Sequence, residues 1–271
     1  MMTNHDNSHE LLCRVMPNLA NQLRTPLNTL YGALQRVLRD EDGKGKETDL
    51  AVLYQSYFRM LRLAGNLSDA PTLLEEEPLL LVNDDIVAFL HGICQRAEEP
   101  VELCGQRLLF ESDKSFHIIA FNAAGMERMI LNLLSNAVKF TGPGGIITVS
   151  VRVRPTVVEL AVEDTGPGLD PAEQDALFNR YLHPDLLDPA PQGLGLGLPL
   201  CRRVAQGHGG TILLSSTPHA GTRAVVSLPN RRMENAKLRD MAFDYAGGFS
   251  HTLLELSDAL PSRAFLPKRL D

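Results

Sequence analysis

Two long stretches near the N-terminus carry apolar residues at alternating spacings of four and three. The seam of the first, about residues 8–40, comprises Leu12, Met16, Leu19, Leu23, Pro26, Leu30, Ala33 and Val37. The seam of the second comprises Leu53, Tyr57, Met60, Ala64 and Leu67. This spacing predicts two helices joined by the polar loop Asp40–Thr48. Because neither helix can bury its seam alone, we expect residues 1–75 to form a homodimeric four-helix bundle. The alternative is a helical hairpin that packs on its own chain.

The pattern changes after Glu75-Glu76-Glu77-Pro78. Alternating apolar runs predict strands at 79–82, 107–110, 117–121, 146–153, 157–162, 211–215 and 223–228. Helical spacing predicts helices at roughly 84–98, 123–139, 171–181 and 196–208. Strands interleaved with helices indicate an α/β sandwich in residues 78–229, and the chain as a whole falls in the α+β class.

Residues 230–271 follow the sandwich as a tail that we expect to be helical. A helical pattern reaches Tyr245, Gly247-Gly248 interrupts it, and Ser250–Leu260 has room for another turn or two. The tail carries the apolar residues Leu238, Met241, Tyr245, Phe249, Leu253, Leu254 and Leu256. They predict packing against the preceding domain, with a partner-binding or autoinhibitory segment as the alternative.

Charge and composition exclude several classes of partner. The net charge of −7 argues against nucleic acid. No apolar run approaches the roughly 18 residues of a membrane span, and residues 1–10 lack the apolar core of a signal peptide. The cysteines (Cys13, Cys94, Cys104 and Cys201) form no C-x-x-C pair. We therefore expect a cytoplasmic protein with reduced thiols and no membrane contact.

Polar residues mark one face of the helix predicted at 123–139. Asn132 and Asn136 are four residues apart and share that face, and Lys139 follows one turn later.

Glycine-rich motifs follow the helix. Asp164 comes after a strand and precedes Gly166 and Gly168, where glycine lets the backbone approach a ligand closely. The run Gly193-Leu-Gly-Leu-Gly-Leu198 lets a loop fold over phosphates before a helix N-terminus. A dinucleotide fingerprint would need a glycine three residues after Gly195, where Leu198 stands, so we reject that interpretation.

These segments, with Leu177–Tyr181, resemble the N-box, G1 box, F-box and G2 box of sensor histidine kinases. That ATPase domain (the GHKL or Bergerat type) is shared with gyrase, the Hsp90 chaperone and mismatch-repair ATPases. The resemblance implies ATP and Mg²⁺ as cofactors, with Asn136 as the metal ligand and Asp164 as acceptor of the adenine amino group. The candidate cofactor-binding residues are Asn132, Asn136, Lys139, Asp164, Gly166, Gly168, Phe178, Gly193, Gly195, Gly197 and Thr222. One departure is Gln192, at a position where the family often has the first lid glycine.

Residues 21–28, NQLRTPLN, resemble the H-box of the same family, usually H-E-L-R-T-P-L-[NT]. Asn21 stands at the position of the phosphate-accepting histidine and Gln22 at that of its acidic neighbour. An amide nitrogen cannot accept a phosphoryl group, because its lone pair is delocalised into the carbonyl, and glutamine cannot act as a base. Thr25 matches the family position that orients water for dephosphorylation of a response regulator.

We therefore expect a degenerate histidine kinase that binds ATP, does not autophosphorylate at Asn21 and regulates a partner histidine kinase or response regulator by contact. Two alternatives stay open, a response-regulator phosphatase that uses Thr25 and a kinase that uses another acceptor.

Overall fold

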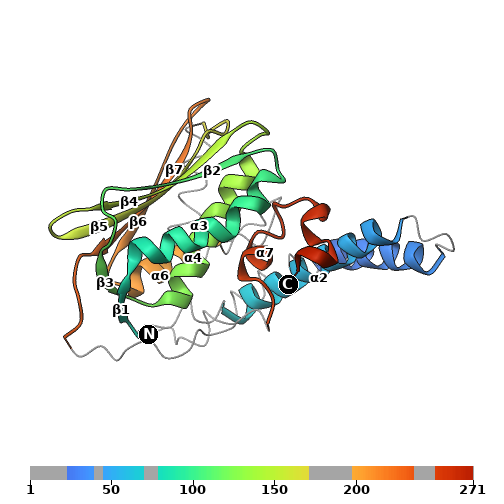
Figure 1. Ribbon diagram of the computed structural model, residues 1–271, viewed down its shortest axis with the longest axis horizontal. Helices are drawn as coiled ribbons and strands as arrows, with labels where there is room; N and C mark the ends of the chain where they lie inside the picture. The colour runs from blue at the N-terminus through green and yellow to red at the C-terminus, as the bar shows by residue number, and fades with distance from the viewer. Residues whose placement is uncertain (1–22, 40–44, 70–78, 171–196, 235–247, 271) are drawn as a thin grey trace, which may run out of the picture.

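A helical hairpin opens the described part of the chain. The computed structural model describes residues 23–39, 45–69, 79–170, 197–234 and 248–270. The helix at 23–39 and α2 (Lys46–Asp69) lie antiparallel and project from the body of the molecule (Figure 1). Arg36 Nε and Asp49 Oδ1 join them at 2.6 Å. Helix α2 begins inside the predicted loop 40–48, with Glu47 and Asp49 in its first turn, where the helix dipole favours negative charge.

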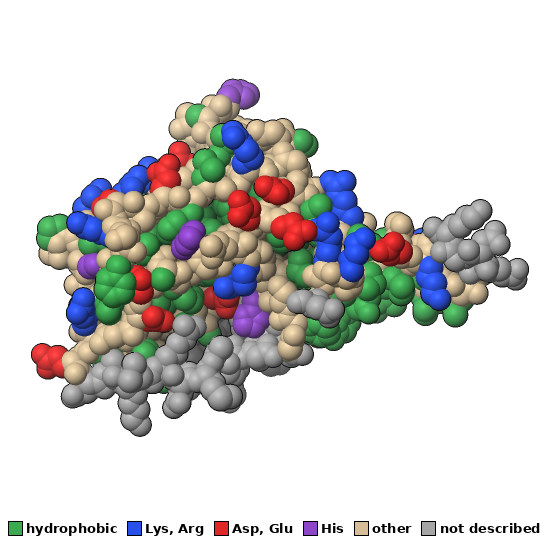
Figure 2. Space-filling view, in the orientation of Figure 1, with side chains coloured by type: hydrophobic (Ala, Val, Ile, Leu, Met, Phe, Trp, Pro, Cys, Tyr) green, Lys and Arg blue, Asp and Glu red, His purple; other side chains and the backbone are tan. Residues whose placement is uncertain are grey.

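The first helix has two apolar faces. Its predicted seam lies inward, with Pro26 and Ala33 buried and Leu30 and Val37 half-buried. A second set of apolar side chains, here called the outer stripe, comprises Leu27, Tyr31, Leu34 and Leu38 and is 38–72% exposed. Figure 2 shows hydrophobic surface along the hairpin. The hairpin alone thus leaves one apolar face uncovered among the described residues.

A five-stranded sheet forms the body, in the order β2-β4-β5-β7-β6. Its strands are β2 (Arg107–Ser112), β4 (Ile146–Val153), β5 (Val157–Asp164), β6 (Thr211–Thr217) and β7 (Gly221–Pro229). Strand β2 runs parallel to β4, and the other neighbours are antiparallel. These strands confirm the predicted runs, because alternating apolar positions give each strand one buried face.

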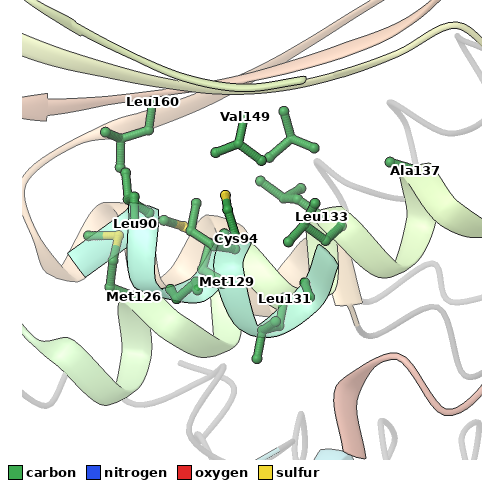
Figure 3. Close-up of a cluster of buried hydrophobic side chains, with 14 of the residues drawn as sticks. Leu90, Cys94, Met126, Met129, Leu131, Leu133, Ala137, Val149 and Leu160 are labelled. Carbon is green, nitrogen blue, oxygen red and sulfur yellow. The ribbon is translucent and has the colours of Figure 1, made fainter. Parts of the chain in front are cut away.

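Three helices cover one face of this sheet (Figure 1). They are α3 (Ile86–Glu102), α4 (Ala123–Phe140) and α6 (Gly197–Gly207). Figure 3 shows Leu90 and Cys94 of α3 and Met129 of α4 meeting Val149 and Leu160 below the sheet. This layer confirms the predicted α/β sandwich and fixes α4, which carries the candidate asparagines.

The strand predicted at 79–82 is shifted along the chain. Strand β1 (Val82–Asp85) pairs antiparallel with β3 (Ile118–Phe121), with Val82 opposite Phe121. The apolar run 79–81 precedes this strand: a Cβ on Gly207 would come 2.6 Å from Leu79 Cδ1, so this leucine packs against the end of α6. Packing on α6 rather than strand pairing therefore explains Leu79, whereas Leu80 is 79% exposed.

The tail returns to the hairpin. It contains α7 (His251–Glu255), η3 (Ser262–Phe265) and η4 (Pro267–Arg269). The ring of Phe58 on α2 lies 5.3 Å from that of Phe249 and 5.4 Å from that of Phe265. Figure 1 shows this segment between the hairpin and helices α3 and α4. The tail therefore packs against the sandwich and also against α2, so the hairpin contacts the rest of its own chain as in the alternative for residues 1–75. The helix expected up to Tyr245 lies largely outside the described residues.

Candidate functional site

Helix α4 brings the predicted polar face together. The helix begins at Asn122, whose side chain accepts a hydrogen bond from the Gly125 amide at 2.8 Å. Further along, Asn132 is 2% exposed, and Asn136 and Lys139 are half-buried. Their spacing of four and three places all of them on one side of the helix, as the sequence predicted.

Arg62 of α2 reaches into this face. Its Nη2 donates to Asn132 Oδ1 at 3.1 Å and its Nη1 to Ser135 Oγ at 3.1 Å. Its Nε lies 3.2 Å from Glu255 Oε2 of the tail. Sequence reasoning missed Arg62, because these partners are 70 or more residues away in the chain. The hairpin and the tail thus meet at the first asparagine of the predicted nucleotide site.

Lys139 lies in a partly desolvated, positively charged surrounding. Burial lowers the pKa of its ammonium group; the field of Asp258 opposes that shift, whereas Arg62 and Arg59 add to it. Its Nζ is 5.6 Å from the centroid of the Phe140 ring. An anion placed here would be attracted by several cations at once.

Asp164 ends β5 opposite Thr222 of β7. Its Oδ1 accepts the Gly166 amide at 2.8 Å, and the carboxylate is 8% exposed. Burial raises the pKa of Asp164, and the amide hydrogens of Gly166 and Thr222 oppose this effect. The carboxylate is thus held in a fixed direction by the turn that follows the strand, as recognition of a base edge requires.

Two glycines around Asp164 cannot carry a side chain. Gly168 has φ +68°, and a Cβ there would lie 2.0 Å from the Thr217 carbonyl oxygen. Gly221 has φ +91°, and a Cβ there would lie 1.8 Å from the Asp164 carbonyl oxygen. At Gly168 the structure shows close packing of the chain on itself, and the predicted approach of its backbone to a ligand stays a prediction. Gly221 was not predicted.

Ser216 of β6 joins β7 to the loop that follows Asp164. Its hydroxyl lies 2.9 Å from Thr222 Oγ1, accepts the Leu169 amide at 2.9 Å and donates to the Gly221 carbonyl at 3.0 Å. Thr222 is half-buried beside it. Ser216 follows Ser215 just after the strand predicted at 211–215 and gave no signal in the sequence. Its role follows from the register of β6 against β7, which pairs it with Thr222.

The remaining predicted residues divide into two groups. Gly197 opens α6, and a Cβ there would come 3.1 Å from Asn132 Oδ1, so the helix after the glycine run packs closely on α4. Phe178, Gly193 and Gly195 lie outside the described residues, as does Asn21.

Thr25 is described and exposed, next to the buried Pro26. Its carbonyl oxygen accepts the Thr29 hydroxyl at 3.0 Å. Its side chain therefore faces outward from the hairpin rather than toward α2.

The donor set fits Mg²⁺ bound with a nucleotide better than a metal held by the protein alone. Within the parts of the chain that the structure describes, no group of three or more His, Cys, Asp or Glu side chains could hold a metal ion. Asn132 Oδ1 accepts a hydrogen bond from Arg62, which agrees with the prediction that Asn136 rather than Asn132 is the metal ligand. One amide oxygen suffices when phosphate and water supply the other ligands.

No helix among the described residues is long and apolar enough to cross a membrane. Residues 122–232 match the family described as histidine kinase-, DNA gyrase B- and HSP90-like ATPase. The chain is 30% identical over 218 residues to histidine kinase P4 of Formosa agariphila, covering 78% of this chain and 16% of that protein. The alignments span only 16–40% of the length of the first three curated relatives.

Solved structures share the fold. The histidine kinase ThkA, crystallised in complex with response regulator protein TrrA, superimposes with a TM-score of 0.61 at 18% identity, covering 84% of this chain and 64% of that one. Full-length ShkA in complex with AMPPNP gives a TM-score of 0.59 at 22% identity, covering 79% of this chain and 46% of that one. The chain thus contains a histidine kinase-, DNA gyrase B- and HSP90-like ATPase domain in residues 122–232, within a sequence similar to histidine kinases.

Proposed function

We propose that this protein is an ATP-binding pseudo-histidine kinase of the cytoplasm, which regulates a partner histidine kinase or response regulator by contact. One observation carries the proposal. The side chains expected to hold nucleotide (Asn136, Lys139 and Asp164) lie on an ordered framework, whereas Asn21 and Gln22 occupy the positions of acceptor and base in the H-box resemblance.

Each residue of the proposed site contacts a different part of the nucleotide. Asp164 accepts a hydrogen bond from the adenine amino group, and its own amide partners hold it in place. Lys139 supplies positive charge to the phosphates, and Asn136 offers an amide oxygen to the metal. Mg²⁺ bound with the nucleotide would offset the negative charge of the phosphates.

ATP then acts as a conformational ligand. It changes the docking of the ATPase domain on the hairpin only if it binds the two arrangements with different affinity. Arg62 supports such coupling, because one side chain of α2 contacts Asn132 and Ser135 of α4.

The hairpin is the proposed dimerisation element. The outer stripe exposes four large apolar side chains, which is the surface that a second hairpin would bury in a four-helix bundle. The same hairpin in an active kinase would offer an equivalent surface, so pairing with a partner kinase uses the same contacts. The ThkA complex with a response regulator gives a precedent for the other class of partner.

A phosphatase that uses Thr25 is the second candidate. It is favoured by the exposed Thr25 side chain, which a docked response regulator could reach. Mixing the protein with phosphorylated response regulators tests this activity. If Thr25→Ala leaves the lifetime of the phosphorylated state unchanged for every regulator that binds, the phosphatase activity is rejected.

Phosphorylation of another histidine is less favoured. His208 Nε2 accepts the Asn122 amide at 2.9 Å and its Nδ1 lies 2.7 Å from the Val204 carbonyl, so both ring nitrogens are engaged. His117 Nε2 lies 2.8 Å from Asn230 Oδ1, and His251 Nδ1 lies 2.8 Å from Glu127 Oε2. Incubation with γ-labelled ATP should give no acid-labile label; such a label would overturn the pseudo-kinase proposal.

Calorimetry with a non-hydrolysable ATP analogue and Mg²⁺ tests the nucleotide site. We expect wild-type protein to bind and Asp164→Ala to lose binding. The matched control is Glu163→Gln, one residue earlier on β5, whose carboxylate is 54% exposed and faces Arg223 instead. Absence of binding by the wild-type protein would exclude ATP as the regulatory ligand. The protein would then act as an adaptor that contacts its partner without nucleotide.

A further inference from the structure

A carboxylate of the tail lies among cations on the phosphate side of α4. Asp258 Oδ2 is 3.2 Å from Arg62 Nη1, and Asp258 Oδ1 is 3.6 Å from Arg59 Nε. Asp258 is also the anion that acts on the ammonium group of Lys139. Three cations from two helices thus share one acidic side chain that is remote from them in sequence.

The neighbouring acid of the tail has a different role. Glu255 is 1% exposed and lies 3.2 Å from Arg62 Nε and 3.5 Å from Arg128 Nε. The Asp258 side chain is 47% exposed. Glu255 therefore anchors α7 in the interior, whereas Asp258 lies at the rim, where solvent and a soluble anion can reach it.

A bound anion at this rim would meet the same cations. Arg62 is held between Asp258 and Asn132, the first asparagine of the nucleotide face. A triphosphate beside Asn136 and Lys139 carries several negative charges, which repel a carboxylate and attract the arginines. The carboxylate of Asp258 and a bound triphosphate therefore cannot both interact fully with these cations.

We propose that Asp258 is an internal competitor for the phosphate-side cations Arg59, Arg62 and Lys139, so that a nucleoside triphosphate displaces it and loosens the tail from this rim. The inference rests on the proposed ATP site. Displacement of Asp258 would make the position of residues 248–270 depend on bound triphosphate, because the same contacts connect the tail to α2.

The test measures affinity for Mg·ATP and for adenosine by calorimetry on the full chain. We expect Asp258→Asn to tighten Mg·ATP binding about three- to tenfold, the size expected for one partly exposed charge, and to leave adenosine affinity within about twofold. Asp258→Glu retains the charge and should bind Mg·ATP like the wild type. The matched control is Glu99→Gln, which removes the ion pair between Glu99 and Arg269 of the same tail, away from Arg62.

The outcomes separate the two proposals. Equal Mg·ATP affinity in wild type and Asp258→Asn overturns the competitor and leaves the nucleotide site standing. Equal tightening in Glu99→Gln also overturns it, since general loosening of the tail would then suffice. Absence of binding by wild type and by Asp258→Asn overturns the proposed ATP site and the competitor together, whereas binding by Asp258→Asn alone supports both.

Discussion

The buried carboxylate of Glu255 should be a main stabiliser of the contact between tail, hairpin and ATPase domain. Its side chain is 2% exposed, and its partner Arg62 is 9% exposed. Glu255→Gln keeps the volume of the side chain and removes its charge, so the variant creates no cavity. The substitution leaves the buried guanidinium group of Arg62 and the partly buried one of Arg128 with less compensating charge.

The structure sets the size of the effect. Removing one partner of a buried ion pair costs about 3–5 kcal/mol. Arg62 keeps Asp258, and Arg128 keeps the Asn66 side-chain oxygen at 3.1 Å, so we expect the lower end, about 3 kcal/mol. At roughly 2–4 °C per kcal/mol for a large domain, Tm should fall by about 6–12 °C.

Denaturation by urea and by heat, followed by circular dichroism, measures this change. Glu47→Gln is the matched control, because its pair with Lys268 also joins α2 to the tail but both side chains are about two-thirds exposed. We expect the control to cost less than about 1 kcal/mol. A double-mutant cycle with Arg62→Met should show strong coupling to Glu255→Gln. Additive effects, or a Glu255→Gln cost no larger than that of the control, would refute the reasoning.

Three further predictions concern other parts of the molecule. Burial lowers the pKa of His208 below its unfolded value, so the unfolded chain binds more protons just below that value. The free energy of unfolding should therefore fall as pH drops from about 6.5. Urea titration at several pH values should show a smaller fall in His208→Gln. Gly221→Ala should lower the free energy of unfolding by more than about 3 kcal/mol and abolish ATP binding, because its Cβ meets backbone atoms. The control Gly144→Ala, at φ +82° but with open space around its Cβ, should lower it by only about 1–2 kcal/mol in the same titration. Tyr31→Glu in the outer stripe should shift a dimer to monomer in sedimentation analysis, and Asn28→Glu on the same helix should not; a Tyr31→Glu protein that stays dimeric would place the dimer contact elsewhere.

Local periodicity determined most of the fold. The alternation along residues 146–153 predicted β4 without change, and the spacing of Asn132, Asn136 and Lys139 predicted the polar face of α4. Such patterns are set by the repeat of a strand or a helix, which each segment carries in its own residues. The same holds for Asp164 at the end of its strand.

The helical seam was predicted, but the second apolar face of the first helix was not. The seam at Leu23, Pro26, Leu30, Ala33 and Val37 follows from heptad spacing. That the outer stripe stays exposed depends on where α2 and the tail lie. A sequence gives the faces of a helix, and only packing decides which face is covered.

Arg62, Ser216 and Glu255 entered the site only through the tertiary structure. Each lies in a segment whose pattern gives no sign of function, and Arg62 and Glu255 are separated by 193 residues. Their meeting depends on the return of the tail between α2 and α4, which apolar contacts such as Phe58 with Phe249 and Phe265 direct. The sequence by itself determined the positions of the candidate nucleotide motifs and placed Asn21 where the H-box resemblance expects the acceptor histidine. The tertiary structure decided which charges surround those motifs, because ion pairs between distant segments form only after hydrophobic packing has placed their helices.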